Sequence, residues 1–320
     1  GTTNELQSYI NEIDPLPSKE TDLILTSGEQ VTIGLLSMIL NKQGIKSIPL
    51  LGWQIPIITD DIHEKGKILN IDNKNIFYYL ENNDVIVLAG FQGINVNGEI
   101  TSLGRGGSDT TAVAIASSIN AERCDIYTDV DGVFTTDPNI EPKAKKIDKL
   151  AYEEMLEMSS TGSKILQTRS VELAMKNNLT LQVLSSFVDR EGTYIVNENE
   201  LIEKEIVSGV SHSKNEAKIS ISGIPDKPGI SAKIFGLMAN SNINVDMIVQ
   251  NISQDGINAN MTFTVPYKDL EYVQKIIQSK HSDLNYSSLS IDSDIAKISV
   301  VGMGMMSQSG VAEKMFTTLA

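Results

Sequence analysis

A glycine-rich segment with one arginine and one aspartate is the part of this sequence best suited to binding an anion. It reads TSLGRGGSDTT from Thr101 to Thr111, with Arg105 between glycines and Asp109 shortly after them. Glycines between a strand and a helix let backbone N–H groups approach an anion, and the helix N-terminus adds partial positive charge. Arginine binds carboxylates through two parallel hydrogen bonds. The segment therefore predicts a carboxylate or phosphate site, although an ordinary helix start capped by Ser108 or Asp109 would explain an isolated motif equally well.

Three other motifs support a ligand site. SGE (27–29) is predicted to open the first long helix, YTDVDGVFTTDP (127–138) follows a predicted strand, and TGSKI (161–165) places a glycine and a serine before a lysine at a helix start. Open α/β folds bind ligands at the carboxyl ends of their strands. Each motif alone has an ordinary explanation, as a first-turn acid, a turn or a surface lysine. Together they predict one site.

Composition limits the classes of partner. The 320 residues carry a formal net charge of −15 and are 41% hydrophobic, so we expect a globular protein of two or three domains that binds neither nucleic acid nor a membrane. We expect no membrane span and no signal peptide, and a cytoplasmic location. Cys124 is the only cysteine and the three histidines lie far apart in sequence, so we expect no disulfide and no metal held by protein side chains.

Alternating helix-like and strand-like segments predict one α/β domain that ends near Val196. The segment 27–44 has helical periodicity, with Val31, Leu35, Met38 and Ile39 on one face. Strands are expected in IKSIPLLGW, DVIVLAG, CDIYTDV, LTLQVLSSF and GTYIV. Helices are expected in NIFYYLENN, after the glycine-rich segment, in YEEMLEM and in SKILQTRSVELAMKNN. Strands separated by helices predict a mostly parallel sheet covered on both faces.

The C-terminal part contains an internal repeat. AKISISGIPDKPGISAKIFGLMA (217–239) recurs as AKISVVGMGMMSQSGVAEKMFTTLA (296–320). After the first copy, two strands and a helix are predicted, which gives the order βαββα of a ferredoxin-like unit. The second copy stops inside its first helix, and the chain opens without a preceding strand. We therefore expect a fragment that lacks both ends of its parent protein.

The motifs SGE, FQG, TSLGRGGSDTTAVA, TDVDGV, TTDP and GSKIL occur in the order found in aspartate kinases. The chain resembles this family, within the amino-acid kinase superfamily, from its first residue to its last. GIPDKPG and NINVDMIVQNIS resemble stretches of the family's regulatory ACT domains, which accounts for the repeat. The resemblance implies a three-layer αβα amino-acid kinase fold over 1–196, a ferredoxin-like βαββαβ ACT domain over 207–283, and a truncated second ACT domain over 284–320.

The resemblance also implies an activity. This would be ATP-dependent phosphorylation of the side-chain carboxylate of L-aspartate to 4-phospho-L-aspartate, the first step of lysine, threonine and methionine biosynthesis, with Mg²⁺ held mainly through the phosphates. Because both reactants are anions, catalysis would consist of positioning and charge neutralisation. Lysine, threonine or both would inhibit through the ACT domains. The family implies a homo-oligomer through these domains, or a heteromer with a separate regulatory subunit.

Matching motifs imply roles for individual residues. Glu29 would bind the ammonium group of aspartate, Arg105 a substrate carboxylate, and Thr3 would be a hydroxyl on the substrate side. Asp109 would orient a catalytic lysine. Lys164 would reach the nucleotide phosphates. The nucleotide pocket would be lined by Thr128, Asp129, Phe134, Asp137 and Lys164, and the effector would be held by Asp226, Gly229, Ser231, Asn244 and Gln250.

Several points stay open in the sequence. The family's phosphate-binding lysine and paired glycines would precede Gly1, so we expect the 320-residue chain alone to be inactive. Phe134 and Asn139 stand where the family often has tyrosine and arginine, which leaves the ATP contacts open. PDKPG could simply be a β-turn, and Gln250 could pair with an edge strand. The inhibiting end product, the number of subunits and a fused homoserine dehydrogenase stay undetermined.

Two other functions compete with a regulated aspartate kinase. One is a non-catalytic amino-acid sensor that keeps a kinase-like shell, and the retained Arg105, Glu29, Asp109 and Lys164 argue against it. The other is a kinase that acts on glutamate or on a nucleoside monophosphate. The duplicated C-terminal unit and the pairing of SGE with GRGGSDTT disfavour this alternative.

Overall fold

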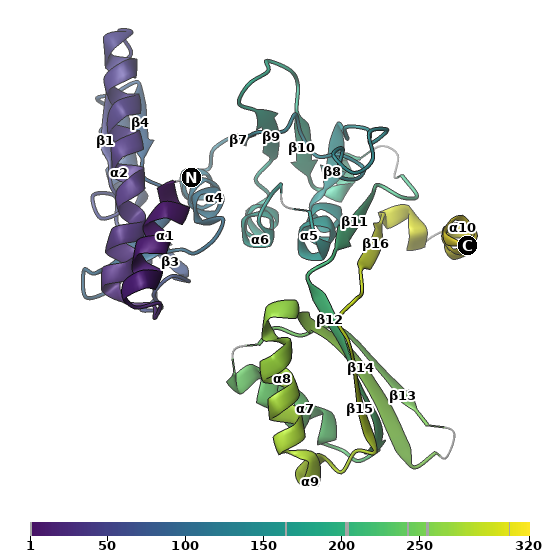
Figure 1. Ribbon diagram of the computed structural model, residues 1–320. Helices are drawn as coiled ribbons and strands as arrows, with labels where there is room; N and C mark the ends of the chain where they lie inside the picture. Colours follow the sequence, from purple (N-terminus) through teal and green to yellow (C-terminus); the bar gives the residue numbers. More distant parts are fainter. Residues whose placement is uncertain (1, 164, 202–204, 242, 254–255, 307) are drawn as a thin grey trace. The chain divides into compact units, whose positions relative to one another are not determined.

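The computed structural model describes residues 2–163, 165–201, 205–241, 243–253, 256–306 and 308–320, which form two units (Figure 1). The first unit comprises Gly1–Val210 with Val300–Ala320, and the second comprises Ser211–Ser299. Residues 300–320 thus belong to the first compact unit, although their sequence repeats part of the second unit. The domain boundaries at 196, 207 and 284 are defined by sequence, and they stay a prediction.

Two helices begin the first unit, α1 (Thr2–Ile13) and α2 (Lys19–Lys42). A capping box starts α2: the Thr21 N–H donates to the Ser18 hydroxyl at 3.3 Å, and the Ser18 N–H donates to the Thr21 hydroxyl at 3.0 Å. The prediction that SGE opens this helix is therefore wrong, because Glu29 lies in its interior. Gly44, with φ at 85°, follows the end of α2 as predicted.

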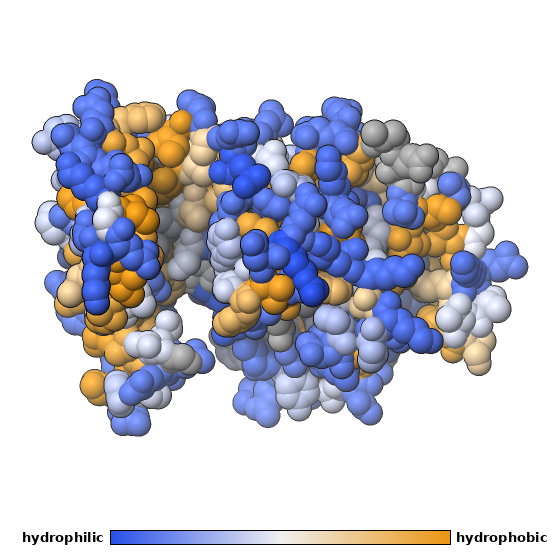
Figure 2. Space-filling model, turned by 90° about the horizontal axis from the view of Figure 1, so that it is seen from above, coloured by the Kyte–Doolittle hydropathy of each residue, from blue (hydrophilic) through white to orange (hydrophobic). Residues whose placement is uncertain are grey.

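The buried face of α2 is not the face predicted from its apolar periodicity. Its buried side chains include Asp22, Thr26 and Ser37 as well as Leu25 and Ile33. The side chains of the predicted face are 53–70% exposed: Val31, Leu35, Met38 and Ile39. Figure 2 shows hydrophobic residues at the surface of the part of the first unit that contains α1 and α2.

By length and composition, α2 could also cross a membrane, contrary to our expectation. The apolar run from 23 to 41 is interrupted by a single charged residue, Glu29. Length and composition do not distinguish a membrane span from a helix packed inside a protein. Here α2 carries the fully buried Asp22, whose carboxylate is hydrogen-bonded to other elements of the first unit.

Two small sheets surround α2. Strands β1 (Ser47–Leu50) and β4 (Val85–Leu88) form a parallel pair, and Ile33 of α2 packs in one cluster with Val87 and Ala89. The second sheet has the order β3-β2-β5-β6, with β2 at Ile57–Thr59, β3 at Ile68–Ile71, β5 at Gln92–Ile94 and β6 at Ile100–Ser102. The predicted turn in NVNGE joins β5 to β6 as a hairpin. Helix α3 (Asn73–Leu80) precedes β4, as predicted.

A third sheet, of order β7-β9-β10-β8, holds the largest core of the first unit. Parallel pairing joins β7 to β9 and β8 to β10, with the strands at β7 (Cys124–Thr128), β8 (Lys149–Ala151), β9 (Leu181–Ser185) and β10 (Thr193–Val196). Figure 1 shows α5 (Tyr152–Thr161) and α6 (Thr168–Asn177) along one side of this sheet. The α/β class is confirmed, but α6 begins later than predicted: Thr161 ends α5, and the described residues Gly162, Ser163 and Ile165 lie between the two helices rather than at a helix start.

The second unit has the predicted βαββαβ order. The elements are β12 (Glu216–Pro225), α7 (Ile230–Asn240), β13 (Asp246–Ile252), β14 (Asn258–Pro266), α8 (Leu270–Ser279) and β15 (Ser288–Asp292), with the short helices η2 (Tyr267–Asp269) and α9 (His281–Leu284). The sheet is antiparallel, in the order β13-β14-β12-β15. Figure 1 shows α7 and α8 on one face of it. Alternate residues of β12, among them Ile219 and Ile221, are buried in its core.

The repeat predicted from sequence is also present in the backbone. In the second copy, β16 (Lys297–Val301) is followed by η3 (Met303–Met306) and α10 (Val311–Leu319). Gly310 precedes α10 with φ 92° and ψ −8°, and Gly229 precedes α7 with φ 91° and ψ −7°. The remaining elements are η1 (Glu198–Glu200) and β11 (Gly209–Ser213), which pairs with β16.

Candidate active site

The glycine-rich loop joins β6 to α4 (Gly107–Ser118) in the way its sequence predicts. Gly104 and Gly106 have φ of 76° and 71°, the left-handed region that favours glycine. A Cβ on Gly104 would lie 2.7 Å from the Glu64 carbonyl oxygen, and one on Gly106 would lie 1.7 Å from Cγ of Gln167. Both positions therefore require glycine for conformation and for space.

Gly106 is the N-cap of α4, and the helix start has no side-chain cap. The ordinary explanation, in which Ser108 or Asp109 caps the helix, is therefore wrong. Arg105 is exposed at the end of the loop and Asp109 is partly buried in the first turn of α4. Burial raises the pKa of Asp109, and a hydrogen bond from the Gln167 backbone offsets part of that rise.

Glu29 lies on α2 seven residues after Asp22 and four before Ile33, so the three side chains share one face of the helix. The position of Glu29 is bracketed by Asp22, which hydrogen-bonds to Ser102 at the end of β6, and by Ile33, which packs with Ala89. The chain after Ala89 returns to the glycine-rich loop, because a Cβ on Gly90 would lie 3.2 Å from Cα of Ser108.

The environment of Glu29 suits a bound cation. This side chain is partly buried, and burial raises its pKa, so an ammonium group would favour its charged form. Thr3 lies in the first turn of α1, where the Thr2 methyl would be 3.4 Å from a Cβ on Gly28. The structure thus brings the first turn of α1 against the SGE motif.

Of the predicted nucleotide residues, Thr128 ends β7, and Asp129, Phe134 and Asp137 lie in the loop that follows it. The Val133 N–H donates to the Thr193 hydroxyl at 2.8 Å, and Phe134 forms an isolated bridge with Lys146. Thr128 donates its hydroxyl to Asp129 at 3.1 Å, and Asp129 is exposed.

The end of that loop is a turn. The Asp137 carboxylate accepts the Asn139 N–H at 2.9 Å, so Asp137 is already used as a turn residue although it is exposed. Phe134 is partly buried. Lys164 lies outside the described residues; the neighbouring Gln167 packs on the glycine-rich loop.

Comparison with known proteins agrees with these motifs. The profile of the Amino acid kinase family matches residues 1–185, and that of an ACT domain matches residues 219–280. The aspartate kinase of Pseudomonas fluorescens and the aspartokinase of Helicobacter pylori strain 26695 are 47% and 45% identical to the whole chain, which spans 78% and 80% of their lengths. The chain belongs to the aspartate kinase family.

Solved structures of this family share the fold. A crystal structure of E. coli aspartokinase III in complex with aspartate and ADP matches with a TM-score of 0.80 at 24% identity, over 99% of this chain and 72% of that one. The aspartate kinase of Synechocystis is 36% identical, with a TM-score of 0.53, over 99% of this chain and 55% of its own. The family predicted from sequence is confirmed.

The ACT unit of this aspartate kinase family member brings two predicted effector residues together. The Ser231 hydroxyl, in the first turn of α7, donates to Oε1 of Gln250 on β13 at 3.1 Å. Gly229 is the left-handed N-cap of α7. Asp226 and Asn244 are exposed, and the Asp226 N–H donates to the Ile257 carbonyl at 3.0 Å.

Residues that the sequence did not single out support the glycine-rich loop. The Arg169 guanidinium donates to the carbonyls of Leu103 at 3.3 Å and Gly66 at 3.0 Å. Asp22 is fully buried and binds Ser102 and the chain at His63 and Glu64. The signal that could have found Asp22 is its spacing of seven residues from Glu29, which places both on one face of a helix.

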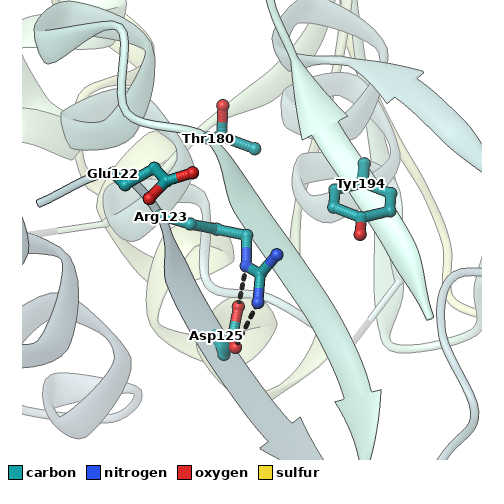
Figure 3. Close-up of a pocket in the computed structure, with 5 residues that line it drawn as sticks. All are labelled: Glu122, Arg123, Asp125, Thr180 and Tyr194. Carbon is teal, nitrogen blue, oxygen red and sulfur yellow. Dashed lines mark hydrogen bonds and ion pairs between the residues drawn. The ribbon is translucent and has the colours of Figure 1, made fainter. Parts of the chain in front are cut away.

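One pocket of the kinase unit, of about 510 Å³, lies apart from the predicted site (Figure 3). It is lined by Glu122, Arg123, Asp125, Thr180 and Tyr194, at the amino ends of β7 and β9 and on β10. Arg123 donates from Nε and Nη2 to both Asp125 oxygens, at 2.5 and 3.0 Å, so its charge is already paired. Ligands of open α/β folds bind at the other ends of the strands. The pocket is therefore a weak candidate for the nucleotide.

Cys124 lies at the start of β7. It is buried, and burial with the nearby Asp125 and Asp109 raises its pKa to about 11. Among the described residues, no group of three His, Cys, Asp or Glu side chains could hold a metal ion.

Proposed function

We propose that the full-length protein phosphorylates the side-chain carboxylate of L-aspartate with ATP. The proposal rests on two features of Glu29: it is partly buried, and it shares a face of α2 with Asp22, which hydrogen-bonds to Ser102 just before the Arg105 loop. A carboxylate and a guanidinium facing one region suit the two charges of an amino acid backbone. The E. coli relative solved with aspartate and ADP supports the same choice of ligands.

Each proposed role follows from the chemistry of the residue. Glu29 holds the ammonium group of aspartate. Burial raises the pKa of Glu29, and the positive charge of the bound ammonium group offsets this effect because it favours the ionised carboxylate. Arg105 holds the backbone carboxylate through paired hydrogen bonds. Thr3 contributes a hydroxyl from α1. The substrate's own side-chain carboxylate is then left free to attack a phosphoryl group.

The nucleotide would occupy the loop after β7. Thr128, Asp129, Phe134 and Asp137 line it, with the Phe134 ring as the apolar surface for the base, and Lys164 reaches the phosphates. Mg²⁺ would be held mainly through the phosphates of the nucleotide. When bound, Mg²⁺ neutralises charge on the transferring phosphoryl group. Asp109 orients a lysine toward the same group.

The ACT unit would bind the regulatory amino acid, lysine or threonine. Ser231 and Gln250 hold one end of the effector, while Gly229, Asp226 and Asn244 complete the site. E. coli aspartokinase III has been solved with lysine and aspartate. Binding would inhibit by favouring a less active arrangement, to the extent that the effector prefers that arrangement. We further propose a cytoplasmic protein that assembles as a homo-oligomer or with a regulatory subunit.

Steady-state ADP release tests the proposal. We expect the full-length protein to turn over aspartate with ATP, and to turn over glutamate much more weakly. Glu29→Gln should raise the KM for aspartate by about tenfold or more, because it removes the charge that faces the ammonium group. Arg105→Lys should do the same through loss of the paired hydrogen bonds. Absence of aspartate-dependent turnover, with effector still bound, would favour the non-catalytic sensor instead.

A further inference from the structure

The most heavily bonded buried acid near the active site is Asp22 of α2, which has no role in the proposed chemistry. Its side chain is 0% exposed. Oδ1 accepts hydrogen bonds from the Glu64 N–H at 3.0 Å and from the Ser102 hydroxyl at 2.5 Å, and Oδ2 pairs with Nδ1 of His63 at 2.7 Å. All these partners lie outside α2. A buried carboxylate is tolerated only with such partners, so the contacts fix α2 against them.

Two of these partners control the turn that carries Arg105. Ser102 is the last residue of β6, three positions before Arg105. Glu64 has φ at 58°, unusual for a residue with a side chain, and its carbonyl oxygen lies 2.7 Å from where a Cβ of Gly104 would be. Asp22 therefore binds both the end of β6, which leads into the turn, and Glu64, whose carbonyl oxygen lies close to Gly104.

Arg169 binds the main chain of the same turn. Its guanidinium binds the carbonyls of Leu103 and Gly66, and the Gly66 N–H donates to the Ser102 carbonyl at 2.9 Å. The main chain before Arg105 is thus held by two side chains, a buried anion and a partly buried cation. Burial lowers the pKa of Arg169, which is the direction expected for a cation removed from water.

We propose that Asp22 is a positioning residue that sets the distance between Glu29 and Arg105. Seven residues separate Asp22 from Glu29 on one helix, which is about 10 Å along the axis and within roughly 20° of the same face. One end of this rigid segment carries the proposed ammonium ligand, and the other end is bonded to the strand that leads to the carboxylate ligand. The inference rests on the proposed function, because the distance between Glu29 and Arg105 matters only if both bind the same substrate.

Kinetics of Asp22→Asn in the full-length protein test this role. The asparagine keeps the volume but turns an N–H₂ group toward one of the donors, so β6 and α2 can shift. We expect the KM for aspartate to rise by about tenfold or more while the KM for ATP changes by less than about twofold. A purely structural role would instead lower the amount of folded enzyme and leave the aspartate KM unchanged.

Ser37→Ala is the matched control. Ser37 lies on the same helix, is buried, and accepts its hydrogen bond from the Ser47 hydroxyl of β1 at 3.0 Å rather than from β6. We expect this change to lower Tm slightly and to leave both KM values as they were. His63→Asn, which can still donate near the position of Nδ1, should restore most of the aspartate affinity lost in His63→Ala.

Ser102→Ala serves if Asp22→Asn does not fold, because it removes a single donor and adds no atoms. We expect an aspartate KM about three- to tenfold higher. An unchanged aspartate KM, or equal changes in the KM of aspartate and of ATP, would overturn the inference. A wild-type enzyme without turnover on aspartate would overturn the proposed function instead, so the two failures are distinguishable.

Discussion

The helix starts at Gly106 and Gly229 use the same local device in two different surroundings. Both glycines are left-handed N-caps without a side-chain cap, with φ and ψ of 71° and 17° at Gly106 and 91° and −7° at Gly229. Both are proposed to face the charged groups of an amino acid. A Cβ on Gly106 would lie 1.7 Å from Cγ of Gln167, whereas one on Gly229 would have nothing within 4 Å.

The two glycines therefore share a left-handed backbone conformation but differ in how closely other residues pack around them. The left-handed turn is a local property of the glycine, and it forms in both units. The crowding at Gly106 comes from the chain near Gln167, far away in sequence, so the catalytic turn is fixed from outside. At the effector turn, the Ser231 to Gln250 hydrogen bond joins two side chains near the surface. A rigid substrate site suits catalysis by positioning, and an open effector site suits reversible binding.

The largest effect expected from this comparison is that of Gly106→Ala. The left-handed backbone costs about 1–2 kcal/mol with a Cβ, and displacing Gln167 adds strain, so we expect a total loss of about 3 kcal/mol of unfolding free energy. Turnover should fall by at least about 100-fold, because the Arg105 loop must move. Urea unfolding and steady-state kinetics measure the two effects. Gln167→Ala in the Gly106→Ala background should recover part of the stability; no recovery would remove packing as the cause.

Asp109→Asn, near the same crowded turn, should raise the stability of the protein while it abolishes activity. Burial raises the pKa of Asp109 above its ordinary 3.8, so the folded state holds the proton more tightly than the unfolded state. Stability therefore falls as pH rises through the window from 3.8 to the folded pKa, and the loss persists at higher pH.

The asparagine has no charge to bury, so Asp109→Asn should raise the urea midpoint at pH 7 to 8, and this gain should shrink as the pH approaches 3.8. Activity should be lost, because an amide cannot orient a lysine through charge. Urea midpoints of both proteins across pH, with turnover at neutral pH, measure this. A lower midpoint at neutral pH would contradict the inferred cost of burial.

Much of the fold could be predicted because strands and turns have local signals. Continuous apolar runs such as DVIVLAG and CDIYTDV became β4 and β7, and the repeat predicted the βαββαβ unit. The start and the buried face of α2 could not be predicted in this way. Its start depends on the capping box at Ser18, upstream of the apolar run, and its buried face is chosen by the polar partners of Asp22 and Ser37 rather than by hydrophobicity.

Some residues of the candidate site could also be predicted from the sequence, and others could not. Arg105 and the glycines around it were found from type and spacing alone, since few other arrangements of a backbone turn need that composition. Asp22 and Arg169 were not found, because they act through contacts with Ser102 and Leu103 that only the folded chain creates. A sequence motif thus shows which residues meet a ligand more readily than which residues hold them in place.

At the open effector turn, Ser231→Ala and Gln250→Ala should have a moderate and selective effect. Each change removes a polar group near the surface that we assign to the effector. We expect about tenfold more lysine or threonine to be needed for half-inhibition, because a hydrogen bond to a charged ligand is lost. Turnover without effector should stay as in the wild type. Inhibition curves at fixed aspartate measure this, and unchanged curves for both variants would remove these residues from the effector site.

The smallest effects are expected from Gly229→Ala and Gly310→Ala, which differ only in the burial of the helix that each glycine precedes. Both glycines have the same backbone conformation and open space around a Cβ. Helix α7 buries Ile234 and Met238, whereas no described residue of α10 is buried. Strain before α7 should therefore lower the unfolding free energy by about 1 kcal/mol, while strain before α10 should leave it unchanged, because a helix without buried contacts opens locally before the unit unfolds.

Urea unfolding of both variants against the wild type measures these changes. Hydrogen exchange of the α10 amides should be fast in all of them. Equal losses of stability would mean that α10 is packed in solution. The two copies of the repeat would then both have a buried helix, and our expectation that they differ in burial would be wrong.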